Sequence, residues 1–87
     1  METQTIERTA LSNLIYNEDY TRKVLPFIKG NYFEVREERI IFEEIFNFVD
    51  KYKKIPTQTS LEIEVGERKD LSEIEYKKVV DIIKTLN

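Results

Sequence analysis

The chain is 87 residues long, which is enough for one small domain with a modest core. It is 40% apolar and 36% charged, carries a net charge of −3 and contains only two glycines and two prolines, as expected of an ordered helical protein. Because cysteine is absent, the composition excludes a disulfide framework and a thiolate metal site. We find no signal-peptide pattern and no uncharged apolar run of about 18 residues, so we expect a cytoplasmic protein without membrane contact.

Two helices are predicted in the first third of the chain. The first runs from Gln4 to Ile15, because its apolar residues recur on one face at helical spacing. Asn17 is a candidate N-cap for a short second helix from Glu18 to about Leu25, which ends there because a residue before proline avoids the helical region. In the half-turn that follows, we predict a left-handed cap at Gly30.

The longest predicted helix covers Val35 to about Lys54 and stops before Pro56. Its last turn is rich in lysine, which suits the negative end of the helix dipole. A short helix is predicted next, at about residues 61–65. Apolar and glutamate residues alternate there, so a strand remains the competing interpretation of that segment.

The last predicted helix opens with a capping box, in which Ser72 and Glu75 satisfy each other's backbone amides, and it continues to Leu86. No internal repeat or low-complexity segment interrupts the chain. The predicted fold class is therefore all-α, a small orthogonal bundle of about five helices forming a single domain over residues 1–87.

The long helix carries an apolar arc of about 160°, wider than the roughly 100° stripe that one-sided packing requires. One interpretation is a central helix clasped by several neighbours, with every apolar residue in the core. The other is that a first seam, Ile41 with Ile45 and Phe48, faces the core while a second seam faces another protein. The last helix raises the same question. The predicted core consists of Leu11, Leu14, Val24, Phe33, Ile41, Ile45, Phe48, Ile82 and Leu86.

The residue types needed for most catalysis are missing. Without histidine and cysteine, the usual catalytic triads, zinc sites and general-base histidines are excluded. The paired acids, such as Glu43 and Glu44, are interpreted as solvated helix faces, and no glycine-rich phosphate loop or calcium loop occurs. We therefore predict no enzymatic activity for this chain, no cofactor and no bound metal.

Direct nucleic-acid binding is disfavoured because acids and bases are balanced along the chain and no segment forms a strongly basic stripe. The alternative function that we keep open is a small helix-turn-helix regulator. Such a protein needs a recognition helix with free basic and amide side chains, whereas the lysines of the last helix are interspersed with acids.

Taken in chain order, the packing motifs of this sequence resemble the amino-terminal domain of DnaB-type replicative helicases, most closely the version carried by T-even-type phages. The resemblance extends from about Glu7 to Leu86. The motifs that carry it are ALSNLIYNEDY, KVLPFI, NYF, RIIFEEI and YKKIPT, with Leu14-Ile15 before a polar turn, Phe33 after the second helix, Arg39 before Ile41-Phe42, and the Pro56-Thr57 stop.

This resemblance implies a module that performs no chemistry, forms the collar of a hexameric ring, and contacts neighbouring protomers and a primase or helicase loader. The chain has no GxxxxGK[ST] nucleotide loop and lacks the helical hairpin that usually follows in the family. We therefore interpret it as an excised N-terminal domain, acting in a phage-infected bacterial cell. The residues predicted to contact a partner are Phe42, Phe46 and Val49, with a rim of Tyr20, Arg22 and Lys23.

Overall fold

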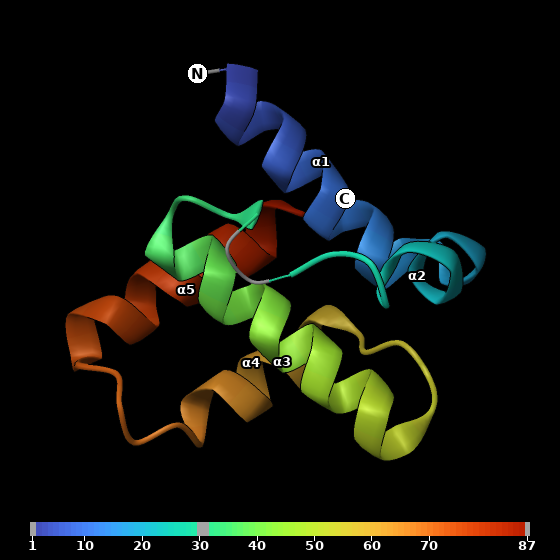
Figure 1. The fold of residues 1–87 in the computed structure, drawn as a ribbon. Coiled ribbons are helices and arrows are strands. Elements are labelled where there is room, and N and C mark those ends of the chain that lie inside the picture. The colour runs from blue at the N-terminus through green and yellow to red at the C-terminus, as the bar shows by residue number, and fades with distance from the viewer. Residues whose placement is uncertain (1, 30–31, 87) are drawn as a thin grey trace.

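The computed structural model describes residues 2–29 and 32–86, with side chains from residue 6 onward. Within these ranges the chain forms five helices and no strand, which confirms the predicted all-α class (Figure 1). The predicted cap at Gly30 lies outside the described residues. The helices are α1 (Glu2–Tyr16), α2 (Glu18–Val24), α3 (Arg36–Tyr52), α4 (Gln58–Gly66) and α5 (Glu73–Thr85).

Local side-chain chemistry starts three of these helices. The Asn17 side chain accepts a hydrogen bond from the backbone amide of Tyr20 at the start of α2. Thr57 caps α4 in the same way. At the start of α5, Ser72 and Glu75 form both halves of the capping box. These bonds satisfy amides that a helix leaves unpaired in its first turn, so the predicted caps at Asn17 and Ser72 are confirmed.

Two details of the predicted elements are wrong. The strand alternative for residues 61–65 fails because Leu61 and Val65, one helical turn apart, are both buried while Ile63 between them is exposed. The long helix ends at Tyr52 rather than Lys54. Lys53 takes a left-handed conformation (φ 60°, ψ 29°) as its C-cap and donates its amide to the carbonyl of Val49, so the chain leaves the helix there.

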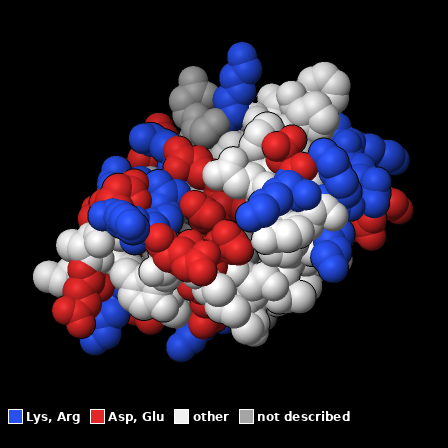
Figure 2. All heavy atoms as spheres, turned by 90° about the horizontal axis from the view of Figure 1, so that it is seen from below, with Lys and Arg blue, Asp and Glu red and all other residues white. Residues whose placement is uncertain are grey.

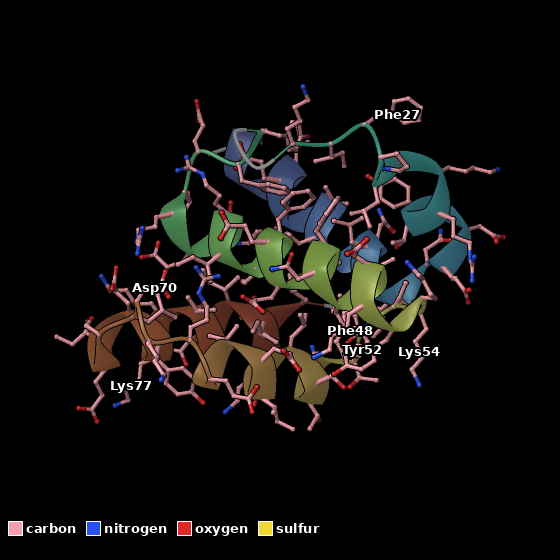
Figure 3. The ribbon with its side chains drawn as sticks, turned by 60° about the horizontal axis from the view of Figure 1, so that its bottom comes forward. Phe27, Phe48, Tyr52, Lys54, Asp70 and Lys77 are labelled. Atoms are coloured by element: carbon pink, nitrogen blue, oxygen red, sulfur yellow. The ribbon has the colours of Figure 1, made fainter. Side chains whose placement is uncertain are left out.

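Helix α3 is the centre of the fold. It packs against α1, α4 and α5, while α2 is joined mainly to α1 (Figures 1 and 3). All the fully buried residues of α3 lie between Glu38 and Ile45; in its second half Phe48 and Val49 are half-buried, and Val49 still packs against the core. The core lies around the first half. Its buried apolar members are Leu11, Leu14, Ile15, Leu25, Phe33, Ile40, Ile41, Phe42, Ile45, Leu61, Val65, Val79, Ile82, Ile83 and Leu86.

The predicted core is confirmed at seven of its nine positions, and Val24 packs against it from a half-buried position. Phe48 is the exception. It lies in the second half of α3, where it is half-buried and its ring packs on that of Tyr52 at a centroid distance of 4.6 Å. Both residues lie together at the end of α3 in Figure 3. Phe48 lies past Ile45, the last fully buried residue of α3, so it is only half-buried.

The end of α5 is fastened by polar side chains from two other helices. The side-chain amide of Gln58 donates to the carbonyls of Ile83 (3.0 Å) and Leu86 (2.7 Å). The hydroxyl of Tyr16 donates to the same Leu86 carbonyl from α1 (3.4 Å). These bonds satisfy carbonyls that the helix end leaves unpaired, and they bring the C-terminal end of the chain beside α1 (Figure 1).

Two carboxyl groups are buried between α1 and α3. Glu38 is fully buried; its Oε2 accepts from the Arg8 guanidinium (2.9 Å), and its Oε1 has no hydrogen-bond partner among the described residues. Glu7, also buried, accepts from the amide of Glu34. Burial raises the pKa of Glu38, the Arg8 charge lowers it, and the neighbouring Glu7 carboxyl raises it further, with a net upward shift.

Candidate protein-interaction surface

Helix α2 is held in place by one buried hydroxyl. Thr21 is fully buried, and its Oγ1 donates to the carbonyl of Leu14 in α1 (2.7 Å). This bond fixes α2 against the end of α1. On the outer face of α2, Arg22 pairs with Glu18 one turn earlier, with Nε 2.8 Å from the carboxylate. Beyond the helix, Pro26 turns the chain toward α3, and Phe27 projects from that turn away from the body of the protein (Figure 3).

The second half of α3 faces α2 without touching it closely, because a hollow separates the two. This hollow has a volume of about 320 Å³, near the lower end of the range for ligand pockets. Its walls are largely apolar, formed by Leu25 and Pro26 on one side and by Phe46 and Val49 on the other, with Ile55 at one end. Phe46 is 43% exposed, which is high for a phenylalanine beside the core. We call this the α2–α3 hollow.

A second hollow of about 640 Å³ adjoins the first and shares Leu25, Pro26 and Phe46 with it. Its floor is more polar and includes Arg68, whose guanidinium bonds Glu44 at 2.9 Å, Asp70 at 2.8 Å and Glu43 at 3.3 Å. Arg68 therefore ties α3 to the loop after α4.

The charges of this network perturb one another. The bond to Arg68 lowers the pKa of the Asp70 carboxyl to about 2. The hydrogen bond to Asp70, together with the nearby Glu44 and Glu43 carboxylates, raises the pKa of Arg68. For Glu44 burial is the larger effect, so its pKa is raised despite the arginine. The four hydrogen bonds of the network use four of the five N–H donors of Arg68, which leaves this guanidinium little capacity for a ligand.

The rim of the α2–α3 hollow has an excess of unpaired positive charge. Glu18 and Arg22 neutralise each other, and the remaining charged rim residues are Asp50, Lys53 and Lys54. Among the described residues, neither lysine forms an ion pair. The face seen in Figure 2 otherwise mixes the two signs, with acidic side chains near its centre and basic ones to either side, and it shows no continuous basic surface.

The structure brings together some of the six predicted contact residues. Phe46, Val49 and Arg22 all line the α2–α3 hollow. Phe42 is buried in the core, where its ring lies 5.2 Å from that of Phe33 and 6.3 Å from that of Phe46, so it supports the surface from beneath. Tyr20 lies against the core and lines a separate small hollow on α1, and Lys23 is exposed but lines neither hollow.

Sequence reasoning missed the far end of the hollow. The sequence predicts that Lys53 and Lys54 lie in the last turn of the helix and complement its dipole, whereas they lie past the helix end and border the hollow. Placing these lysines at the hollow requires knowing that α3 ends at Tyr52. A lysine in a left-handed cap cannot be predicted from propensity, because glycine and asparagine are the usual residues there.

Comparison with known proteins identifies the family. The model of the DnaB-like helicase N-terminal domain matches residues 1–86. The chain belongs to this family. It is also 32% identical over 76 residues to the DnaB-like replicative helicase of Enterobacteria phage T4, an alignment that covers 87% of this chain and 16% of that relative. The chain thus spans about a sixth of the relative's length. No solved structure matches it.

Membership of the DnaB-like helicase N-terminal domain family confirms the resemblance drawn from the packing motifs. The described part of the chain contains no group of three or more acidic, histidine or cysteine residues arranged to hold a metal ion. It also contains no helix long and apolar enough to cross a bilayer.

Proposed function

We propose that this DnaB-like N-terminal domain is a protein-interaction and oligomerisation module of a replicative DNA helicase. It contacts neighbouring protomers of a ring and a primase or helicase loader, and it performs no chemistry itself. Family membership supports the helicase context. The observation that carries the interaction role is the partly exposed apolar surface in the second half of α3, where the exposed Phe46 and the half-buried Val49 line a hollow.

The physical reason is the cost of leaving apolar surface in water. Removing apolar surface from water is favourable by about 25 cal/mol per Å², and a complex retains what is left after the entropic costs of association. The first half of α3 is buried by its own domain, whereas in the second half Val49 is only half-buried against the core and Phe46 is 43% exposed. The wide apolar arc of α3 therefore has a different explanation in each half of the helix. The first half packs into the core, and in our proposal the second half contacts a partner.

Sedimentation equilibrium over a concentration series tests the proposal. We expect a mass of at least twice the 10.5 kDa monomer at high concentration. Phe46→Asp should return the mass to that of the monomer without changing the helical circular dichroism spectrum, and it should also abolish co-sedimentation with the primase or loader of the same source. Phe27→Asp is the matched control, because Phe27 is 82% exposed and lines neither hollow.

Three results would count against this function. Loss of helicity in Phe46→Asp would show that this residue belongs to the core. Equal effects of the two substitutions would show that the hollow is not the contact surface. A wild-type chain that stays monomeric at every concentration and binds neither the primase nor the loader would remove the interaction role.

The helix-turn-helix alternative predicts a different outcome. In α5 the basic residues Lys77, Lys78 and Lys84 share the helix with Glu73, Glu75 and Asp81, which leaves little net charge to meet phosphates. We expect no binding to duplex DNA at low salt in a fluorescence anisotropy titration. Salt-dependent binding would favour the regulator instead.

A further inference from the structure

The two hollows beside Phe46 form one elongated groove. They share Leu25, Pro26 and Phe46 as walls, so they lie side by side along α3. From these shared walls the groove reaches Ile55 in one direction and Arg68 in the other. A depression of this extent admits a run of side chains rather than a single one, so a segment of protein chain is the occupant that fits it. We call it the extended groove.

Unpaired basic side chains predominate along the extended groove. Some of its charged residues are already paired, Arg22 with Glu18, and Arg68 with Glu43 and Glu44. The other charged lining residues, which form no ion pair among the described residues, are Lys29, Lys53, Lys54 and Asp50. The whole chain carries a net charge of −3, so this local excess of lysine runs against the balance of the molecule. Free ammonium groups beside apolar walls attract a partner that is both apolar and acidic.

The backbone at the end of α3 places two of these lysines beside the apolar walls. Lys53 adopts the left-handed region (φ 60°), which favours glycine and is costly for a residue with a Cβ atom. Residues held in such conformations cluster at functional sites. The left-handed turn ends the helix and takes the chain past the groove, so that Lys53, Lys54 and Ile55 all line it with both lysine side chains exposed.

We propose that the extended groove binds an acidic amphipathic segment of another protein. The apolar side chains of that segment lie between Phe46, Val49 and Ile55, and its carboxylates meet Lys53 and Lys54. The inference rests on the proposed function and deepens it by naming the chemistry of the partner segment. Apolar grooves take amphipathic helices through anchors about one turn apart. The unpaired lysines add selectivity, because a basic segment would bring like charges together.

Peptide selection tests the chemistry of the occupant without assuming its sequence. A displayed library of short random peptides is selected on the wild-type chain, and peptides that also bind the Phe46→Asp variant are removed. The retained peptides therefore depend on the groove. We expect them to be rich in aspartate and glutamate, with large apolar residues three or four positions apart. A retained set that is neutral or basic, or a selection that retains no peptide, would overturn the inference.

Two neutralising substitutions on the same rim test the charge contact with little risk to folding, since both side chains are exposed. Lys54→Gln should weaken the binding of a retained acidic peptide about threefold at low salt, as expected for the loss of an exposed ion pair. Asp50→Asn should strengthen the binding of the same peptide about threefold, because it removes a repelling carboxylate. Fluorescence anisotropy of the labelled peptide measures both dissociation constants.

Lys77→Gln on α5 is the matched control for Lys54→Gln. It makes the same charge change far from Lys54, as Figure 3 shows, and should alter peptide binding less than twofold. Damage to the fold would weaken binding in both rim variants, so effects of opposite sign identify an electrostatic contact. Rim effects of the same sign, or no larger than that of Lys77→Gln, would overturn the inference.

The outcomes separate this inference from the proposed function. If groove-dependent peptides are retained but are not acidic, the groove is an interaction surface for another kind of partner, so the proposed function stands and the inference falls. If no peptide is retained while Phe46→Asp abolishes self-association, the occupant is a second copy of the chain, and again only the inference falls. If no peptide is retained and the wild-type chain neither associates nor binds the primase or loader, both fall.

Discussion

At the scale of single residues, the unusual group is the Glu38 carboxyl. It is buried between α1 and α3 with one oxygen unpartnered, and burial, partly offset by Arg8, raises its pKa above the ordinary value of 4.5. The folded protein therefore holds this proton more tightly than the unfolded chain does. The stabilisation that results is fully present below about pH 4.5 and is lost as the pH rises through the folded-state pKa.

Replacing Glu38 by glutamine removes that titration. Between pH 5 and 8, the unfolding free energy of Glu38→Gln should fall less steeply than that of the wild-type chain, as measured by urea denaturation at a series of pH values. Glu67→Gln, which removes an exposed carboxylate, should leave the wild-type slope unchanged. Parallel slopes for Glu38→Gln and the wild-type chain would mean that burial does not control this carboxyl.

At the scale of elements, the start of α5 depends on the capping box. Ser72 accepts from the amide of Glu75 at 3.1 Å, and the Glu75 carboxylate accepts from the amide of Ser72 at 3.1 Å while also pairing with Arg36 of α3 at 2.9 Å. Ser72→Ala leaves an amide of the first turn without its side-chain partner. We expect the unfolding free energy to fall by about 1 kcal/mol in urea denaturation.

A second substitution of Ser72 provides the control for the loss of stability in Ser72→Ala. Ser72→Thr keeps a hydroxyl at the cap and should retain most of the stability, since threonine is also a favourable N-cap. If Ser72→Ala and Ser72→Thr have the same stability, the hydroxyl does not support the helix.

The sequence predicts well those features of the helices that depend on neighbouring residues. The caps at Asn17 and Ser72 involve residues three apart. The end of α3 was predicted less well, because the left-handed cap at Lys53 ends the helix before Pro56 can. The other differences concern tertiary contacts. Phe48 lies beyond Ile45, the last fully buried residue of α3, and is only half-buried. In the segment 61–65, the burial of Leu61 and Val65 one turn apart selects the predicted helix over the competing strand.

The predicted contact residues also differ in whether local sequence pattern or tertiary contacts decide their placement. Phe46 and Val49 line the hollow because helical periodicity gives their direction, and Arg22 lines it from α2, which begins at a recognisable cap. Tyr20 and Lys23 lie on the same helix but do not line the hollow. Their placement depends on the rotation of α2 about its axis, which the buried hydroxyl of Thr21 fixes through a contact with α1.

At the scale of the whole molecule, stability depends on a small core. Phe33 is fully buried and lies within 5.2 Å of Phe42 and 5.0 Å of Tyr32, measured between ring centroids. Phe33→Ala leaves a cavity that should cost about 3–5 kcal/mol, a large part of the stability of so small a domain. Thermal unfolding followed by circular dichroism should show a lowered or absent transition.

Phe27→Ala removes the same side chain from an exposed position and should change the unfolding free energy by less than about 0.5 kcal/mol. A comparable loss in both variants would contradict the placement of the core around the first half of α3. The same Phe→Ala substitution at Phe33 and at Phe27 thus compares a buried position with an exposed one.

The central position of α3 also has a consequence for the motions of the chain. Opening α3 breaks its packing with α1, α4 and α5 together, whereas α2 is joined mainly to α1 and can detach with fewer losses. Amide hydrogens in the middle of α3 should therefore exchange with solvent only through global unfolding, and those of α2 through local opening. The α2–α3 hollow would then have one rigid wall and one yielding wall, and its width could adjust to an arriving side chain at little energetic cost.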